Sequence, residues 1–95
     1  MQIKMSEEVF AWYKDELGLG KGDCIRFYIQ FASYRMSSNG FTLGIRKDTP
    51  IDPGVQLEKE GITFFMEKDD EWYLEGQDLC IDLNDHGETE MYQSM

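Results

Sequence analysis

The first apolar stretch of the chain has the spacing of a helix. Its large apolar side chains recur at intervals of three and four residues, which places them on one face of a helix. Ser6 offers a side-chain oxygen to an unpaired backbone N–H of the first turn, and the carboxylates of Glu7 and Glu8 favour the positive end of the helix dipole. Gly18 can adopt the left-handed conformation that often follows a helix. The sequence therefore predicts a helix over residues 6–17.

Two later stretches alternate between apolar and polar residues. Residues 24–31 and 41–46 both have this period of two, which is typical of a strand with one buried face. Residues 37–40, with the sequence Ser-Ser-Asn-Gly, favour a turn between them. These two strands are predicted to form an antiparallel hairpin with a long loop.

The remainder of the chain has the pattern of short strands separated by turns. Pro50 and Pro53 lack backbone donors, so residues 48–54 are predicted to be a surface connection outside any regular element. The expected elements after it are strands at 55–58 and 62–67, a short helical turn at 69–72, a strand at 79–83, a turn at 84–87 and a last strand at 89–92.

These elements describe one domain that spans residues 1–95. Its fold class is mainly β (α+β), with an N-terminal helix packed on a curved sheet of about six or seven short strands. Apolar residues make up 41% of the chain and aromatic residues 14%, which is too much for a disordered segment. The residues on the apolar phase of their elements predict a core of Phe27, Ile29, Leu43, Phe64 and Ile81 facing Val9 and Leu17.

Charge is distributed unevenly along the chain. The net charge is −10, and residues 48–95 carry fourteen acidic against two basic residues. Such a field repels phosphate, so nucleic acids and anionic membrane surfaces are excluded as partners. The ordinary interpretation is that the acidity maintains solubility. The alternative is that this acidic half, including the run at 69–71, engages a basic surface of a protein partner.

The composition indicates a cytoplasmic protein. The N-terminus lacks the apolar run of a signal peptide, and no stretch approaches the roughly 20 apolar residues that span a bilayer. Cys24 and Cys80 lie 56 positions apart and form no CxxC motif, which fits a reducing compartment. Both cysteines are expected to be free thiols.

Catalytic and metal-binding patterns are weak in this sequence. His86 is the single histidine, and it falls in a predicted turn away from any motif of nucleophilic catalysis. Residues 82–87 match the start of a calcium loop, but the twelfth position is Gln93 instead of a bidentate Glu. The sequence therefore predicts a protein that is not an enzyme and has neither catalytic residues nor a metal site.

Five short stretches, spread over nearly the whole chain, carry a family resemblance. They are Gly20-Lys21-Gly22-Asp23, Arg26-Phe27-Tyr28, Asn39-Gly40-Phe41, residues 48–53 and residues 72–79. Together they resemble the HesB-like proteins of the YneR branch, which belongs to the wider HesB/IscA family of A-type carriers. The resemblance implies a folded half-barrel sheet with an N-terminal helix and a link to iron–sulfur cluster biogenesis.

The cysteines that the carriers use for their cluster are replaced in this chain. The first of the three falls at Ser38, and the C-terminal Cys-Gly-Cys motif is missing. No cofactor is therefore expected, and iron or an iron–sulfur cluster would need an atypical ligand set. Two hypotheses stay open: a non-enzymatic accessory in iron–sulfur cluster biogenesis, or a metal-free protein-interaction module that uses its acidic half or the loop at 33–40. The sequence does not indicate the oligomeric state.

Overall fold

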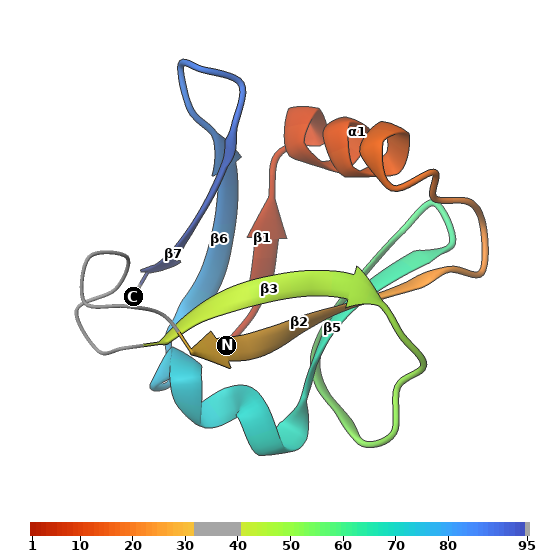
Figure 1. Ribbon diagram of the computed structural model, residues 1–95. Helices are drawn as coiled ribbons and strands as arrows, with labels where there is room; N and C mark the ends of the chain where they lie inside the picture. The colour runs from red at the N-terminus through yellow and green to blue at the C-terminus, as the bar shows by residue number, and fades with distance from the viewer. Residues whose placement is uncertain (32–40, 95) are drawn as a thin grey trace.

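The computed structural model describes residues 1–31 and 41–94 of the chain (Figure 1). Within these residues, one α-helix and one 3₁₀ helix accompany seven strands. In chain order the elements are β1 (Ile3–Met5), α1 (Glu7–Glu16), β2 (Cys24–Phe31), β3 (Phe41–Lys47), β4 (Pro53–Lys59), β5 (Ile62–Glu67), η1 (Lys68–Leu74), β6 (Asp78–Leu83) and β7 (Thr89–Ser94).

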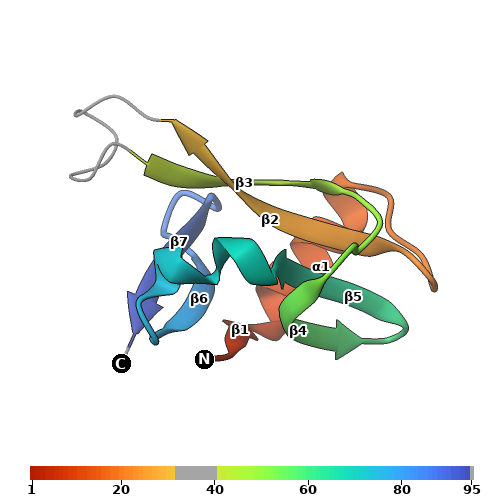
Figure 2. The same ribbon diagram turned by 90° about the horizontal axis from the view of Figure 1, so that it is seen from below.

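The strands form two sheets that make an open half-barrel (Figures 1 and 2). One sheet has the order β3-β2-β5-β4 and the other the order β1-β6-β7. Strand β1 also contacts β4, so the sheets adjoin there, and β3 and β7 are the two outer edges. The predicted fold class, mainly β with an N-terminal helix, is confirmed.

Helix α1 begins and ends where the sequence signals predict. The Ser6 hydroxyl accepts a hydrogen bond from the Val9 backbone N–H at 3.2 Å, which caps the first turn. After the cap residue Leu17, Gly18 adopts a left-handed φ of 61° that ends the helix. The helix buries Val9, Phe10 and Tyr13 against the half-barrel.

The core is centred on Phe64 of β5. Its ring lies 6.1 Å from the ring of Phe10 and 6.2 Å from the stacked ring of Phe27. Of the predicted core residues, Val9, Phe27, Phe64 and Ile81 are buried, while Leu17 and Leu43 are partly buried against this cluster.

Ile29 is the exception among the predicted core residues. It is half-buried and lies outside the core cluster, although it shares the inward phase of Phe27. Ile29 lies toward the C-terminal end of β2, and Figure 1 shows that end of β2 pointing away from α1. The period-two pattern determines on which face of the strand a side chain lies, but it does not determine how much of that face is buried by other elements.

The expected surface connection at 48–54 is wrong at its end, because β4 begins at Pro53 and includes Gly54. Proline is tolerated as the first residue of an edge strand, where its missing N–H breaks no ladder bond. The register between β4 and β5 shifts between Pro53 and Gln56, which marks a bulge.

Strand β1 is not among the predicted elements. It pairs in parallel with β6, so that Ile3 lies opposite Leu79 and Met5 opposite Ile81. Three residues are too few for an alternating pattern to stand out, and parallel pairing with a strand some 76 residues away leaves no local signal.

No helix of the described residues is long and apolar enough to cross a membrane.

Candidate functional site

An ion-pair network lies on the outer face of the larger sheet, opposite the core. The Arg26 side chain donates to Asp70 of η1 at 3.0 Å and lies 3.5 Å from Asp48. Asp48 also pairs with Arg46 at 3.3 Å. The hydrogen bond from Arg26 to Asp70 raises the pKa of the guanidinium. The network ties η1 and the chain after β3 onto the sheet.

The loop before β4 is held by a buried carboxylate. Glu67 is 9% exposed and accepts hydrogen bonds from the backbone N–H groups of Ile51 at 3.0 Å and Asp52 at 2.8 Å. These charge-assisted bonds compensate the carboxylate for its burial. The Ile51 side chain points to solvent and is 88% exposed, which makes it one of the exposed large apolar groups of the surface.

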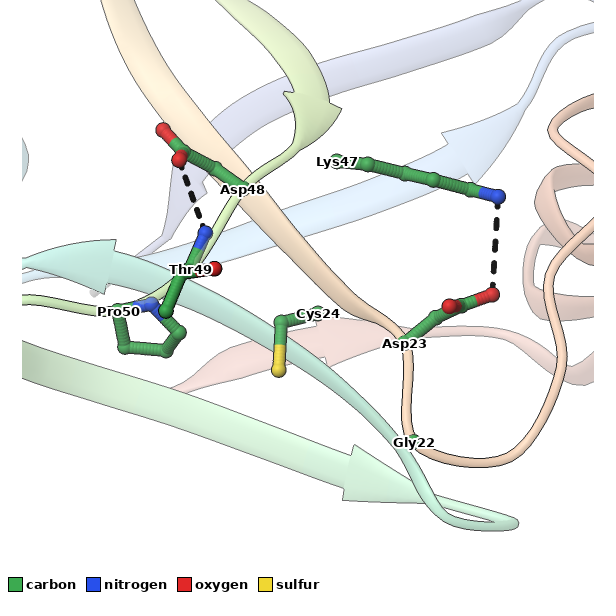
Figure 3. Close-up of a pocket in the computed structure, with 7 residues that line it drawn as sticks. All are labelled: Gly22, Asp23, Cys24, Lys47, Asp48, Thr49 and Pro50. Carbon is green, nitrogen blue, oxygen red and sulfur yellow. Dashed lines mark hydrogen bonds and ion pairs between the residues drawn. The ribbon is translucent and has the colours of Figure 1, made fainter.

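Cys24 lies in an open pocket of about 560 Å³ at the base of β2 and β3 (Figure 3). The charged side chains of its lining have partners: Lys47 pairs with Asp23 at 3.7 Å, and the Asp48 carboxylate accepts from the Thr49 N–H at 2.8 Å. That backbone hydrogen bond is the main reason why the pKa of Asp48 is lowered. Among the described residues that line this pocket, no histidine accompanies the thiol of Cys24 to act as the base of a cysteine nucleophile.

A second, smaller space separates the outer edges of the two sheets. It has a volume of about 130 Å³. We call it the β3–β7 gap, and its lining residues are Thr42, Leu43, Tyr73, Leu79, Met91, Tyr92 and Gln93. None of these seven side chains is charged at neutral pH. Both views place the start of β3 on the same side of the molecule as β7 (Figures 1 and 2).

Tyr92 stands between this gap and the acidic side of β6. Its hydroxyl donates to the Asp82 carboxylate at 2.6 Å, and this bond raises the pKa of Tyr92 to about 12. The side chain is 47% exposed. Tyrosine with one apolar face and one fixed polar end is a residue type that protein interfaces favour.

The residues that the sequence offers for metal or cluster binding are not brought together. Cys24 lies on β2 and Cys80 is buried on β6, in the other sheet, and both are free cysteines. Among the described residues, no group of three His, Cys, Asp or Glu side chains could hold a metal ion. Ser38 and the rest of the loop at 33–40 lie outside the described residues.

The calcium-like stretch forms a hairpin turn. The Asn84 side-chain oxygen accepts from the backbone N–H groups of His86 at 2.9 Å and Glu88 at 3.0 Å. This oxygen therefore closes the turn between β6 and β7. His86 is exposed at the tip of that hairpin.

The acidic run on η1 divides into different environments. Asp69 is exposed, whereas Asp70 is held by Arg26 and the Glu71 side chain lies against Gly54 of β4. The three acidic side chains at 69–71 therefore do not form one uniform acidic surface, because Asp70 is held in an ion pair. The sequence places Arg26 on the polar phase of its strand, but it gives no sign of an acidic partner 44 residues later.

No family model matches the chain. It is 36% identical over 93 residues to a Bacillus subtilis protein named pyruvate dehydrogenase inhibitor, with 98% of each chain covered. It is 28% identical to an uncharacterized protein of Staphylococcus saprophyticus, with 90% of each chain covered. An uncharacterized protein of Staphylococcus haemolyticus is 24% identical, over 100% of this chain and 99% of the relative.

Proposed function

This chain belongs to the family of the Bacillus subtilis pyruvate dehydrogenase inhibitor, and we propose from this membership that it binds a pyruvate dehydrogenase and lowers its activity. The observation that carries the proposal is the extent of the match. The similarity covers 98% of both chains, so it includes the helix and both sheets of the half-barrel.

The surface of the described residues supports binding to a protein. Ile51 is 88% exposed and Trp72 is 58% exposed, and large apolar side chains of this kind anchor protein interfaces. The uncharged β3–β7 gap adds a recess between the two sheets. Acidic residues adjoin both side chains in the sequence, Asp52 next to Ile51 and Glu71 next to Trp72, and such charges can steer a basic partner surface toward them.

The arrangement of reactive side chains favours binding over catalysis as the mode of action. His86 is at the tip of the β6–β7 hairpin, while Cys24 lies at the base of β2 among paired charges. General acid–base catalysis needs the base within hydrogen-bond reach of the group that it activates. The inhibition is therefore proposed to be stoichiometric, one chain blocking one site on the enzyme.

The test is a titration of purified chain against a purified pyruvate dehydrogenase complex. Pyruvate-dependent NADH formation is measured, and size-exclusion chromatography reports complex formation. Lactate dehydrogenase, which also uses pyruvate, is the control enzyme. The proposal expects a saturable fall in activity and co-elution with pyruvate dehydrogenase alone. Unchanged activity at saturating chain, with separate elution, would refute it.

A further inference from the structure

Within the part of the chain that the structure describes, the half-barrel is open along one side, where the outer edges of β3 and β7 line the β3–β7 gap. Resting on the proposed function, we propose that this gap receives an extended segment of the inhibited enzyme, which adds as a strand to these edges. Strand addition of this kind recognises a partner through unpaired backbone groups, with side-chain pockets supplying specificity.

The free edge of β3 presents Leu43 and Ile45. Cys24 and Asp48 lie opposite each other at one end of the β2–β3 ladder. The Asp48 N–H donates to the Cys24 carbonyl at 3.0 Å, so they form a hydrogen-bonded pair. Hydrogen-bonded and non-hydrogen-bonded pairs alternate along an antiparallel ladder. Leu43 pairs with Ile29 in the non-hydrogen-bonded class, so its N–H and C=O point away from β2.

The free edge of β7 presents Met91 and Gln93 by the same reasoning. The Asn84 N–H donates to the Glu88 carbonyl at 2.8 Å, which sets the phase of the β6–β7 ladder. Gln93 lies opposite Leu79 and Met91 opposite Ile81, both in the non-hydrogen-bonded class. Their backbone groups therefore point away from β6.

These outward-facing residues coincide with the lining of the gap. Leu43, Met91 and Gln93 all line it, so the two edges direct backbone groups that are unpaired within residues 1–31 and 41–94 toward one shared space. The other two sheet edges are poorer templates. Strand β4 starts with Pro53 and carries a bulge, and β1 has three residues.

Charge determines which segment fits. The lining is uncharged, and exposed carboxylates stand on or beside the elements that provide β7's side of the gap, namely Glu75 after η1, Glu88 before β7 and Glu90 on β7. The cations of β3 are already paired, Arg46 with Asp48 and Lys47 with Asp23. The occupant is therefore an extended segment that alternates apolar residues with lysine or arginine.

Gln93→Pro is the variant that isolates the backbone contribution. It removes an outward N–H without breaking a bond to β6. Proline requires an extended backbone at the residue before it, and Tyr92 already has one because it lies within β7. Gln93→Ala removes the same side chain and its bond to the Tyr73 carbonyl but keeps the N–H. Thr89→Pro places the same change at the other end of β7, outside the gap lining. Circular dichroism and the thermal midpoint confirm that each variant folds.

The affinity of each variant for pyruvate dehydrogenase is measured by titration calorimetry. Gln93→Pro is expected to weaken binding about tenfold or more, while Gln93→Ala and Thr89→Pro stay within about twofold of wild type. Amide hydrogen exchange in the wild-type complex is expected to slow in peptides that cover β3 or β7.

Two results separate the possible failures. If wild type binds, but folded Gln93→Pro binds equally well and exchange slows only in η1, the strand-addition proposal is overturned and the proposed function stands. If wild type itself does not bind pyruvate dehydrogenase, the proposed function fails, and the inference that rests on it fails as well.

Discussion

Arg26 on β2 and Asp70 on η1 are joined by a 3.0 Å hydrogen bond across the outer face of the larger sheet. Both side chains are about one-fifth exposed, at 22% and 21%. The bond links residues that are 44 positions apart in the chain, and Phe65, which lies next to Arg26 in the register of β2 and β5, is fully buried. Asp70 thus belongs to the fold, although it sits in an acidic run that resembles solvated surface.

Asp70→Asn is expected to lower the free energy of unfolding by about 1–2 kcal/mol, because a charge-assisted bond is weakened in a partly buried place. Arg26 keeps its pairing with Asp48, which limits the loss. Asp69→Asn, one position earlier and exposed, should change the same quantity by less than about 0.5 kcal/mol. Urea denaturation of the two variants makes the comparison, and equal values for both would contradict a structural role for Asp70.

The ion pair of Asp78 is expected to make the stability of the fold depend on pH in the acidic range. Its carboxylate accepts from Lys4 Nζ at 3.0 Å and from the Gln2 N–H at 2.9 Å, which fastens β1 to β6. The Lys4 bond is the largest cause of the lowered pKa of Asp78. A carboxyl whose folded pKa is lowered stabilises the fold above its unfolded pKa of about 4, and this contribution is lost as the pH falls through the folded pKa.

The thermal midpoint of wild type should therefore fall more steeply than that of Asp78→Asn when the pH is lowered below about 4. Above that pH, wild type should be the more stable of the two, because only the ionised carboxylate is stabilised by Lys4. Thermal melts at a series of pH values test this. Parallel curves for the two proteins would show that Asp78 does not contribute to the acid response.

Phe27 carries the prediction about the core. Its side chain is fully buried and stacks on Phe64, so Phe27→Ala should cost about 3–5 kcal/mol through lost burial and the cavity left behind. Ile29→Ala, two residues along the same face, should cost markedly less because Ile29 is half-buried and outside the core cluster. Chemical denaturation measures both. A larger cost for Ile29→Ala would mean that this end of β2 is covered more than the structure shows.

Local signals in the sequence predict much of this fold. The cap at Ser6, the alternation along β2 and the Glu60-Gly61 turn, with φ values of 52° and 79°, all act over a few residues. These features determine where elements begin, end and face. The predicted helix, the β2–β3 hairpin and the later short strands follow from them.

Pairings between distant segments could not be predicted in this way. The parallel pairs β1–β6 and β2–β5 arise from packing of the whole chain, and so does the meeting of the β3 and β7 edges. The candidate gap depends on these pairings. Leu43 and Gln93 look like ordinary strand residues in the sequence, and only the ladder phase shows that their backbone groups point outward.

The iron–sulfur hypothesis gives a prediction about the two thiols. Cys24 and Cys80 lie in different sheets, and cluster binding by cysteine needs several thiolates around one centre. Protein reconstituted anaerobically with iron and sulfide should show no stable cluster absorption. Replacing both cysteines by serine should leave any weak iron retention unchanged. A stoichiometric chromophore that the double substitution abolishes would instead support an atypical cluster site.

The acidic half of the chain predicts how association depends on salt. Surface charges attract a basic partner over a distance that salt screens to roughly 8 Å at physiological ionic strength. Asp69 and Glu75 are exposed on and next to η1, so reversing both to lysine should slow association with pyruvate dehydrogenase while leaving stability nearly unchanged. Asp70 is kept because it holds Arg26.

The matched control reverses Asp15 and Glu16, which are also exposed, at the end of α1. It alters net charge by the same amount, and lysine is favourable at a helix C-terminus. If the acidic half steers binding, association measured by surface plasmon resonance slows more for the η1 pair than for the α1 pair, and the difference shrinks as salt rises. Equal association rates for both variants at low salt would mean that the slower association comes from net charge alone. The acidic half would then have no specific role in binding, and its charge would serve solubility.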